Sequence, residues 1–282
     1  MIKSPINYMG SKRRLLKQIL PLFPDNIHTF YDLFAGGGVV SLNTKAKYHV
    51  WNDLNKPLVD MFRDLSTLDE EQQFALYKNP LEMLHREDFE ELRTEYNQGQ
   101  YQGLDKSIVL YELIISSFNG LACFNKKNQY NMPWNSRLTK NYYKGKLRTL
   151  VAYIDTVKDG YTFTSKSYDE VIDLDRVSKN DFVYLDPPYT QTSAPYNDGS
   201  RNLGWTTDDD KRLLGYLDSL NGLGIKFAMS NILSYRGEDN QILVDWLGQH
   251  KDIKAIHLNM DYHTSTYHTK PNKSDEVLIV NY

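Results

Sequence analysis

The stretch FVYLDPPY, residues 182–189, decides the fold and the place of the functional site. Its first four residues are β-branched, aromatic or aliphatic, and they predict a short buried strand. Pro187 and Pro188 lack a backbone N–H and fix φ, so the chain must leave the sheet after Leu185. Since open α/β sheets bind ligands at the carboxyl ends of their strands, this turn predicts a ligand site.

The residues of that turn suit an exocyclic amine on a flat ring. Asp186 and the Pro187 carbonyl are two acceptors that match the two hydrogens of such an amine, and Tyr189 offers an aromatic ring for stacking. Gripping both hydrogens would localise the nitrogen lone pair and make it nucleophilic. The simpler interpretation is an ordinary Pro-Pro turn preceded by an aspartate, and the rest of the chain decides between the two.

A second informative stretch is TFYDLFAGGGVVSLN, residues 29–43. We expect a strand over 30–34, a sharp glycine turn over 35–38 and then the start of a helix that includes Leu42. A strand, a glycine turn and a helix in this order are typical of nucleotide-cofactor sites, because small residues let a ligand approach the backbone.

Two further groups fit such a cofactor site. Asp53 follows the next expected strand, 48–51, about 20 residues after the first, where an acid grips ribose hydroxyls. The alternative for Asp53 is the N-cap of the following helix. Tyr8 and Lys12 flank Gly10 and offer a ring and an ammonium from one turn; the alternative there is a basic amphipathic helix that packs on the sheet.

Composition bounds the class of protein. The 282 residues, 40% hydrophobic and 24% charged, suffice for one large α/β domain with a smaller insertion. The single cysteine, Cys123, excludes an intramolecular disulfide and a cysteine-based zinc site, and the seven histidines offer no convincing ligand pair, so we expect no metal. We find no signal peptide and no apolar run of membrane-span length, and expect a cytoplasmic protein without a membrane partner.

Charge is distributed unevenly along the chain. The net charge is −3, yet the 36 acids leave the stretch from Leu113 to Ile154 without a single Asp or Glu. The same stretch carries seven basic residues interleaved with aromatic ones. This pattern favours a surface that tracks phosphates, with rings that stack on bases, over an ordinary solvated basic face.

The remaining pattern gives the domain organisation. Residues 55–118 are predicted to be helical and 119–145 to form a loop or hairpin, which makes 56–150 a mostly helical insertion. The strand pattern resumes at 161–164 and continues at 225–229 and 276–282. We therefore assign 1–55 and 151–282 to a catalytic domain and 56–150 to a target recognition domain.

These landmarks, in this order, resemble the Dam family of DNA adenine-N6 methyltransferases, class alpha, and in particular its small phage-encoded members. The resemblance covers essentially the whole chain through the motifs NYMGSKRRLL, DLFAGGGVVSLN, WNDLN and FVYLDPPY. It implies an α/β fold: a Rossmann-like S-adenosylmethionine-dependent methyltransferase sheet with a reversed C-terminal strand and an inserted, mostly helical target recognition domain. It also implies S-adenosylmethionine as cofactor and double-stranded DNA as partner.

The resemblance assigns roles to individual residues. The implied catalytic residues are Asp186, Pro187, Pro188 and Tyr189. The implied cofactor contacts are Tyr8, Lys12, Phe34, Ala35, Gly36, Gly37, Asp53, Tyr168 and Asp186. The implied DNA contacts are Asn7, Arg93, Phe118, Asn119, Leu121, Asn125, Lys126, Pro133, Arg137 and Tyr196. Phe118 would wedge into the duplex where the adenine leaves, and Tyr196 would close over the flipped base.

The expected reaction is methylation of N6 of a flipped adenine in double-stranded DNA, within GATC or a related short site. Cys123 stands where members that read GATC place an arginine, so a shorter or degenerate site with the same adenine stays open. The alternatives are a catalytically inactive DNA-binding protein, the same chemistry on RNA adenosine, or on a glutamine amide, which Asp186 matches less well. We expect the protein to be a monomer in solution and two copies to act on one palindromic site.

Overall fold

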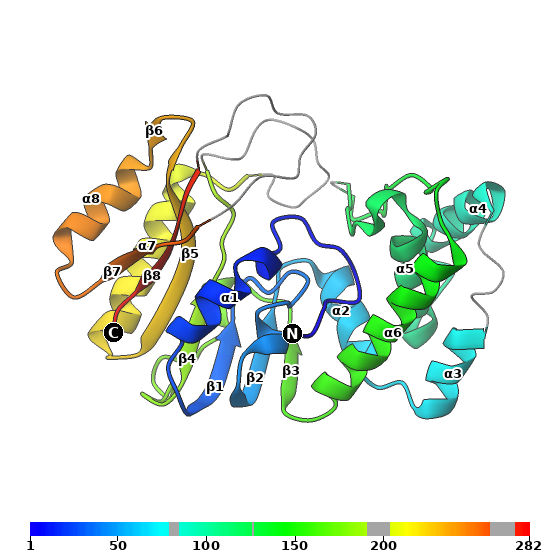
Figure 1. Ribbon diagram of the computed structural model, residues 1–282, viewed down its shortest axis with the longest axis horizontal. Coiled ribbons are helices and arrows are strands. Elements are labelled where there is room, and N and C mark those ends of the chain that lie inside the picture. Colours follow the sequence, from blue (N-terminus) through cyan, green and yellow to red (C-terminus); the bar gives the residue numbers. More distant parts are fainter. Residues whose placement is uncertain (79–84, 126, 191–203, 260–273) are drawn as a thin grey trace.

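The computed structural model describes residues 1–78, 85–125, 127–190, 204–259 and 274–282 (Figure 1). A twisted sheet with helices on both faces forms one part of the molecule, and a helical lobe lies beside the edge of the sheet that β3 forms. The N-terminal segment passes between the sheet and this lobe, whereas the C-terminus lies at the other end of the sheet (Figure 1).

The sheet has the strand order β3-β2-β1-β4-β5-β8-β7, with the short β6 paired to β5. The strands are β1 (Ile27–Asp32), β2 (Ala46–Asn52), β3 (Tyr161–Thr164), β4 (Phe182–Leu185), β5 (Lys226–Tyr235), β6 (Glu238–Asp239), β7 (Lys254–His257) and β8 (Ser274–Val280). The strands β1 to β5 pair in parallel, and β8 runs antiparallel to both β5 and β7. The predicted α/β fold with a reversed C-terminal strand is confirmed.

Strand β4 lies at the centre of the sheet and is buried on both faces. Val183 and Leu185 pack into a cluster with α7 (Thr207–Gly222) and α8 (Gln241–Gln249). Phe182 and Tyr184 pack on the opposite face with the short helix α1 (Leu16–Ile19). Burial on both faces explains why this strand is a continuous apolar run without alternation.

The helical lobe contains α2 (Lys56–Leu65), α3 (Glu70–Lys78), α4 (Arg86–Asn97), α5 (Gly103–Ser116) and α6 (Lys140–Val157). Its core is continuous with that of the sheet, because Trp51 on β2 packs against Phe62 of α2 and Tyr153 of α6. The Tyr153 hydroxyl also donates to the Phe62 carbonyl at 2.7 Å. The boundary expected at 150 falls inside α6, which crosses back to the sheet.

Two local predictions are wrong. The segment after the glycine turn forms only a 3-10 turn, Ser41–Asn43, instead of a helix. The Asn43 side chain donates to the Val39 carbonyl at 2.8 Å, and this carbonyl would receive the Asn43 N–H in an α-helix. The predicted loop over 119–145 ends early, because α6 begins at Lys140 with the Thr139 side chain as its cap.

Candidate active site

The candidate site lies where the carboxyl ends of β1 and β4 meet. These parallel strands are neighbours, and the Leu33 N–H donates to the Tyr184 carbonyl at 3.0 Å just before both chains leave the sheet. The connections from β1 and β4 lead toward opposite edges of the sheet, so this is a topological switch point. The glycine turn and the DPPY stretch therefore lie side by side.

Asp186 is held by two partners. Lys12 forms an ion pair with it at 2.8 Å, and the Tyr189 hydroxyl donates to it at 3.0 Å. Both contacts go to Oδ1, so Oδ2 makes no hydrogen bond or ion pair with a described residue. The side chains of Lys12 and Asp186 are 9% and 19% exposed, so the pair is largely shielded from water and is strengthened accordingly.

Tyr189 completes this group. The Lys12 ammonium lies over its ring at 4.8 Å from the centroid, a distance suited to a cation–π contact. Burial and the nearby Asp186 carboxylate raise the pKa of the Tyr189 hydroxyl well above its ordinary value. The hydroxyl therefore stays protonated at neutral pH and remains a hydrogen-bond donor to Asp186.

The glycine turn is shaped by Tyr8. Gly36 has φ of 49°, and a Cβ placed on it would lie 2.4 Å from the Tyr8 ring. A Cβ on Gly37 would lie 2.9 Å from the Tyr8 side chain. The sequence prediction was that small residues admit a ligand to this backbone; in the structure they first admit an aromatic ring of the protein itself. Tyr8 thus lies at the turn, where it was expected.

Asp53 joins the ends of β1 and β2. Its Oδ2 accepts the Gly36 N–H at 2.9 Å, and its Oδ1 accepts the Asn55 N–H at 2.8 Å. The N-cap of α2 is Asn55, so Asp53 is not the cap that the alternative interpretation proposed. The carboxylate instead ties the glycine turn to the start of α2.

Aromatic rings form a wall next to the turn. Phe34 stacks on Tyr168, with centroids 5.4 Å apart and an angle of 29° between the planes. Trp205 meets Phe34 edge-on at 5.9 Å and Tyr168 at 6.3 Å. The sequence prediction included Phe34 and Tyr168 and missed Trp205, for which an aromatic residue just before a predicted helix cap was the only signal.

A buried acid at the end of β1 was also missed. Asp32 is 1% exposed, accepts a hydrogen bond from the Ser41 hydroxyl at 3.1 Å through Oδ2, and has no partner for Oδ1 among the described residues. Burial, followed by the charges of Asp186 and Asp53, raises the pKa of Asp32 to about 8. An acid inside the predicted strand 30–34 was the available signal.

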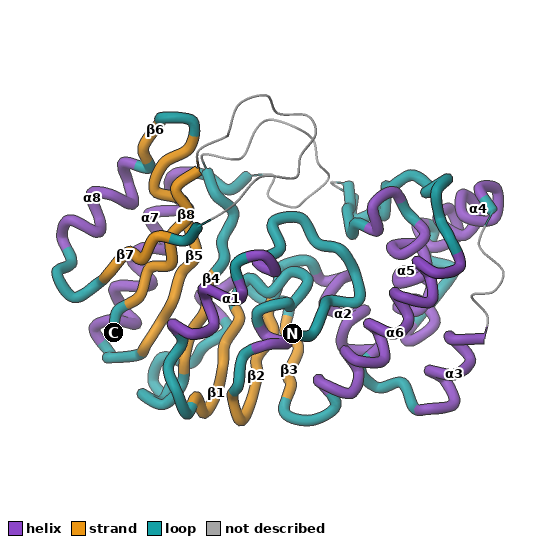
Figure 2. Tube along the Cα trace, in the orientation of Figure 1, coloured by secondary structure: helices purple, strands orange, loops and turns teal. Residues whose placement is uncertain are grey.

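The loop between α5 and α6, mostly without regular structure (Figure 2), brings together several predicted DNA contacts. Phe118 is 53% exposed, and its N–H donates to the Pro133 carbonyl at 2.8 Å. Leu121 forms a β-bridge with Asn7, and Asn119 adopts the left-handed conformation with φ of 59°. These residues share one rim of the lobe although up to 126 positions separate Asn7 from Pro133.

Asn7 bonds the N-terminal segment to this loop. Its side-chain Nδ2 donates to the Asn119 carbonyl at 2.6 Å, and its N–H donates to the Gly120 carbonyl at 3.2 Å. Its Oδ1 accepts from the Lys146 ammonium at 2.8 Å. Burial, together with the charges of Arg13 and Lys3, lowers the pKa of Lys146 to about 8. Asn7 is therefore engaged in holding the loop.

The other predicted DNA contacts are more dispersed. Arg93 donates to the Met132 carbonyl at 2.8 Å, and Arg137 is exposed. The Asn125 side chain accepts from the N–H groups of Lys127 and Gln129 and so holds a turn. Cys123 is buried. Lys126 and Tyr196 lie outside the described residues.

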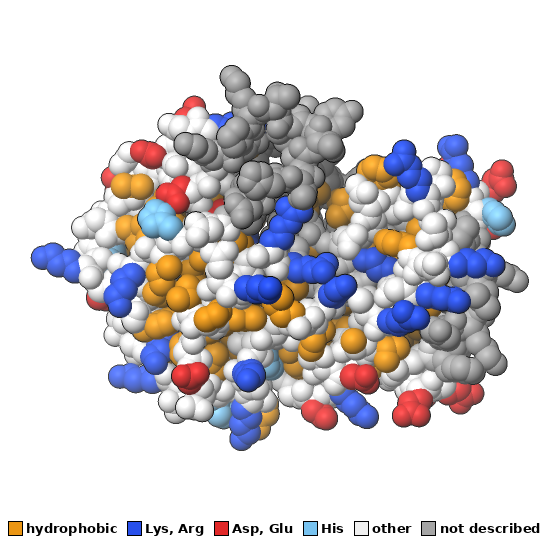
Figure 3. Space-filling view, in the orientation of Figure 1, with side chains coloured by type: hydrophobic (Ala, Val, Ile, Leu, Met, Phe, Trp, Pro, Cys, Tyr) orange, Lys and Arg blue, Asp and Glu red, His pale blue; other side chains and the backbone are white. Residues whose placement is uncertain are grey.

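Positively charged side chains are concentrated on the face shown in Figure 3. Lys and Arg side chains cover the middle of this face, and acidic side chains lie mostly toward its edges. Across the described part of the chain, no three His, Cys, Asp or Glu residues are grouped so as to hold a metal ion. The helices in the same ranges include none with the length and apolar character needed to span a bilayer.

Comparisons with known proteins identify the family of this chain. The family model for D12 class N6 adenine-specific DNA methyltransferases matches residues 8–262. The modification methylase StsI of Streptococcus sanguinis is 37% identical over 290 residues, and the type II methyltransferase M.FokI of Planomicrobium okeanokoites is 36% identical over 287. Each alignment covers 100% of this chain and 43% of the relative, so the chain spans less than half the length of these proteins.

One sequence prediction needs correction. The DNA N-6-adenine-methyltransferase of Escherichia phage P1 is 22% identical over 81% of this chain, well below the two methylases above. The expected special likeness to phage-encoded enzymes is therefore wrong. The chain belongs to the D12 class of N6 adenine-specific DNA methyltransferases.

Proposed function

We propose that this protein transfers the methyl group of S-adenosylmethionine to N6 of an adenine in double-stranded DNA. The observation that carries the proposal is the Lys12–Asp186–Tyr189 group at the end of β4, next to the glycine turn at the switch point. Family membership supports the same reaction class. The chain supplies acceptors and a ring for a base, and no nucleophile of its own is required.

The residues around the glycine turn fit S-adenosylmethionine. Asp53 presents carboxylate oxygens beside the turn, and such oxygens accept more than one hydrogen bond, which suits ribose hydroxyls. The wall formed by Phe34 and Tyr168 suits the adenine ring of the cofactor. We assign the other contacts to Tyr8, Lys12, Asp186 and the backbone of Ala35, Gly36 and Gly37. The cofactor supplies an electrophilic methyl group on a sulfonium.

Asp186 and the Pro187 carbonyl receive the two hydrogens of the adenine N6 amine in this proposal. Since Lys12 and Tyr189 both contact Oδ1, Asp186 presents Oδ2 to the base. The two acceptors pull the nitrogen out of conjugation with the ring and localise its lone pair. Tyr189 stacks on the base with the face opposite Lys12, and Pro188 fixes the backbone between these groups. Catalysis then consists of positioning and of charge placement in a shielded cleft.

The lobe formed by residues 56–150 is the proposed target recognition domain. Phe118, exposed at the rim, is suited to fill the space that a flipped adenine leaves, and Leu121 and Pro133 are placed beside it for apolar contacts with thymine. Arg137 and the basic middle of the surface in Figure 3 suit phosphates. Asn119, Asn125, Arg93, Lys126 and Tyr196 complete the proposed DNA contacts, with Asn7 as support.

The proposed recognition sequence is GATC or a related short site. Cys123 is 5% exposed, so this position contributes no base-reading side chain of the kind that an arginine would provide for guanine. Asn125 is held in a turn by its own amide, which leaves Lys127 as an exposed donor in this segment. A weaker reading of the outer base pairs, and hence a degenerate site around the same adenine, follows from this arrangement.

The test is methylation of unmethylated plasmid DNA with labelled S-adenosylmethionine, followed by long-read mapping of modified bases. N6-methyladenine at one short recurring sequence, absent with Asp186→Ala, is the expected result. DNA binding by the wild type without any methylation would show an inactive DNA-binding protein instead. Preferential labelling of RNA in a parallel reaction would move the substrate to RNA adenosine.

A further inference from the structure

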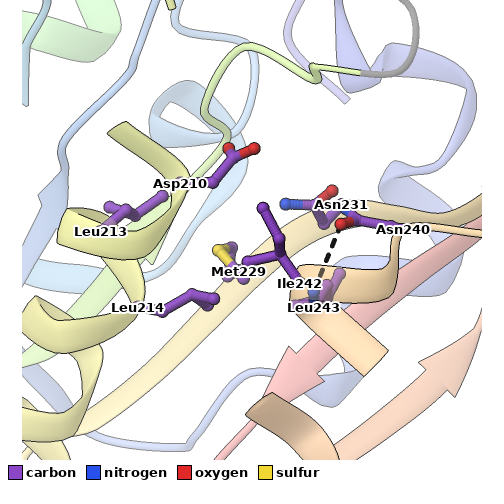
Figure 4. Close-up of a pocket in the computed structure, with 8 residues that line it drawn as sticks. All are labelled: Asp210, Leu213, Leu214, Met229, Asn231, Asn240, Ile242 and Leu243. Carbon is purple, nitrogen blue, oxygen red and sulfur yellow. Dashed lines mark hydrogen bonds between the residues drawn. The ribbon is translucent and has the colours of Figure 1, made fainter. Parts of the chain in front are cut away.

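Asp210, in the first turn of α7, joins two segments that flank the candidate site. Its Oδ1 accepts the indole N–H of Trp205 at 2.7 Å, and its Oδ2 accepts a short hydrogen bond from the Thr190 hydroxyl. Figure 4 shows Asp210 at the rim of a small pocket between α7, β5 and α8, which is lined by apolar side chains such as Leu213 and Ile242 and by the polar Asn231 and Asn240. Its carboxylate points away from the pocket, toward Thr190 and Trp205.

Both partners of Asp210 are next to functional groups. Thr190 directly follows Tyr189, whose hydroxyl bonds to Asp186. Trp205 contacts Phe34 and Tyr168, the two rings of the aromatic wall. One carboxylate therefore connects the exit of the DPPY stretch with the wall beside the glycine turn.

The other acids of this helix turn have different tasks. Asp209 forms a capping box with Thr206, so the start of α7 is already capped. Asp208 is 87% exposed at its side chain and meets only Lys211, at 3.4 Å, among the described residues. Favourable interaction with the helix dipole is available to all three acids, so it does not explain why Asp210 alone points back to Thr190 and Trp205.

We propose that Asp210 is a positioning residue that holds Thr190 and Trp205 in register and thereby orients both the DPPY stretch and the aromatic wall of the cofactor site. The inference rests on the proposed methyltransferase function. Asp210 touches neither base nor cofactor in this account. Its two hydrogen bonds fix Thr190 and Trp205 relative to α7, and these two residues adjoin the groups that contact the base and the cofactor.

The test compares three variants at one helix turn. Asp210→Ala removes both hydrogen bonds. Asp210→Asn keeps an acceptor for Trp205 and gains a donor for the Thr190 hydroxyl, which can also accept. Asp208→Ala is the matched control, because it removes the same charge from the same turn. The measurements are the single-turnover methylation rate and the affinity for S-adenosylhomocysteine without DNA.

We expect Asp210→Ala to lower the methylation rate about 10- to 100-fold and to weaken S-adenosylhomocysteine binding about 5-fold or more, as loss of two partly buried hydrogen bonds implies. Asp210→Asn should stay within about 3-fold of the wild type and Asp208→Ala within about 2-fold. An Asp210→Ala variant as active as the control would overturn the proposal. Equal damage in Asp210→Asn and Asp210→Ala would also overturn it, since charge and not hydrogen-bond geometry would then matter.

Single-partner variants keep the proposal testable if Asp210→Ala does not fold. Thr190→Val should lower the methylation rate and leave S-adenosylhomocysteine affinity unchanged, whereas Trp205→Phe should weaken that affinity first. Identical effects on both measurements would contradict the assigned division. The affinity measurement needs no turnover. A wild type that binds S-adenosylhomocysteine and methylates nothing would refute the proposed function. The role of Asp210 would then be tested by the S-adenosylhomocysteine affinity of its variants alone.

Discussion

The sheet edge that we propose to be catalytic and the loop between α5 and α6 that we propose to read DNA are built in opposite ways. Asp186 follows a strand that is buried on both faces, and its carboxylate is fixed by an ion pair and a tyrosine hydroxyl. The loop between α5 and α6 has little regular structure and is held by side chains that bond to backbone, such as Asn7 to Asn119 and Asn125 to Gln129. Packing thus positions the chemistry, and individual polar contacts position the proposed DNA contacts.

A substitution at Asp186 should separate the two regions most strongly. We expect Asp186→Ala to reduce methylation about 100- to 1,000-fold, as removal of one preorganised polar group does in other active sites. Because the recognition loop is built separately, DNA affinity in a gel-shift or anisotropy assay should stay within about 3-fold. Asp173→Ala is the control, because Asp173 is an exposed acid whose carboxylate bonds only to Arg176 and to the Asp175 N–H among the described residues. Loss of DNA binding in parallel with activity would contradict the separation.

The second prediction concerns Gly36, in the glycine turn. A Cβ at this position would lie 2.4 Å from the Tyr8 ring, so Gly36→Ala must displace Tyr8. We expect a loss of about 1–3 kcal/mol in the free energy of unfolding and weaker S-adenosylhomocysteine binding. Gly99→Ala is a matched control, because Gly99 also has positive φ, 78°, but no atom lies within 4 Å of its added Cβ. Equal destabilisation in both variants would show that backbone strain, and not Tyr8, governs the turn.

The recognition side is tested at Asn7. Asn7→Ala removes the bonds to Lys146 and to the Asn119 carbonyl, and should therefore loosen the loop that carries Phe118. We expect base flipping, followed by 2-aminopurine fluorescence at the target position, to fall about 5-fold, while cofactor affinity without DNA stays unchanged. Met9→Ala, at an exposed neighbour, should change neither measurement. A variant that loses cofactor affinity first would place Asn7 in the catalytic edge.

A pH dependence of stability, separate from activity, is expected from Asp32. Its native pKa of about 8 lies above the ordinary value near 4, so the native state binds more protons between these pH values. The contribution of Asp32 to stability is complete below pH 4 and is lost as the pH rises toward 8. Asp32→Asn cannot titrate, and its melting temperature relative to the wild type should rise from pH 5 to pH 8, by about 2–4 °C for each kcal/mol. Parallel curves would contradict the raised pKa.

The features of the fold that packing controls could be predicted from the sequence. The apolar run 182–185, the two prolines after it and the glycines over 36–38 predicted the buried strand and the two turns correctly, because burial on both faces and absent side chains leave direct marks on composition. The expected helix beyond the turn failed because one side chain, Asn43, captures the Val39 carbonyl.

The missed features share a physical cause. Asp210 was not singled out in the sequence, and only the fold brings Thr190 and Trp205 to it from 20 and 5 positions away. Asn7 meets Lys146 across 139 positions. Single hydrogen bonds between distant positions leave no periodic pattern in the sequence, so they become visible only in the structure.

The most direct measurement is a crystal structure of the protein with S-adenosylhomocysteine and a duplex that contains the mapped site. The account predicts a flipped adenine whose N6 lies about 3 Å from an oxygen of Asp186 and about 3 Å from the Pro187 carbonyl, with the cofactor beside the 34–37 turn. An adenine that remains stacked in the duplex, or an Asp186 carboxylate that points away from N6, would contradict it.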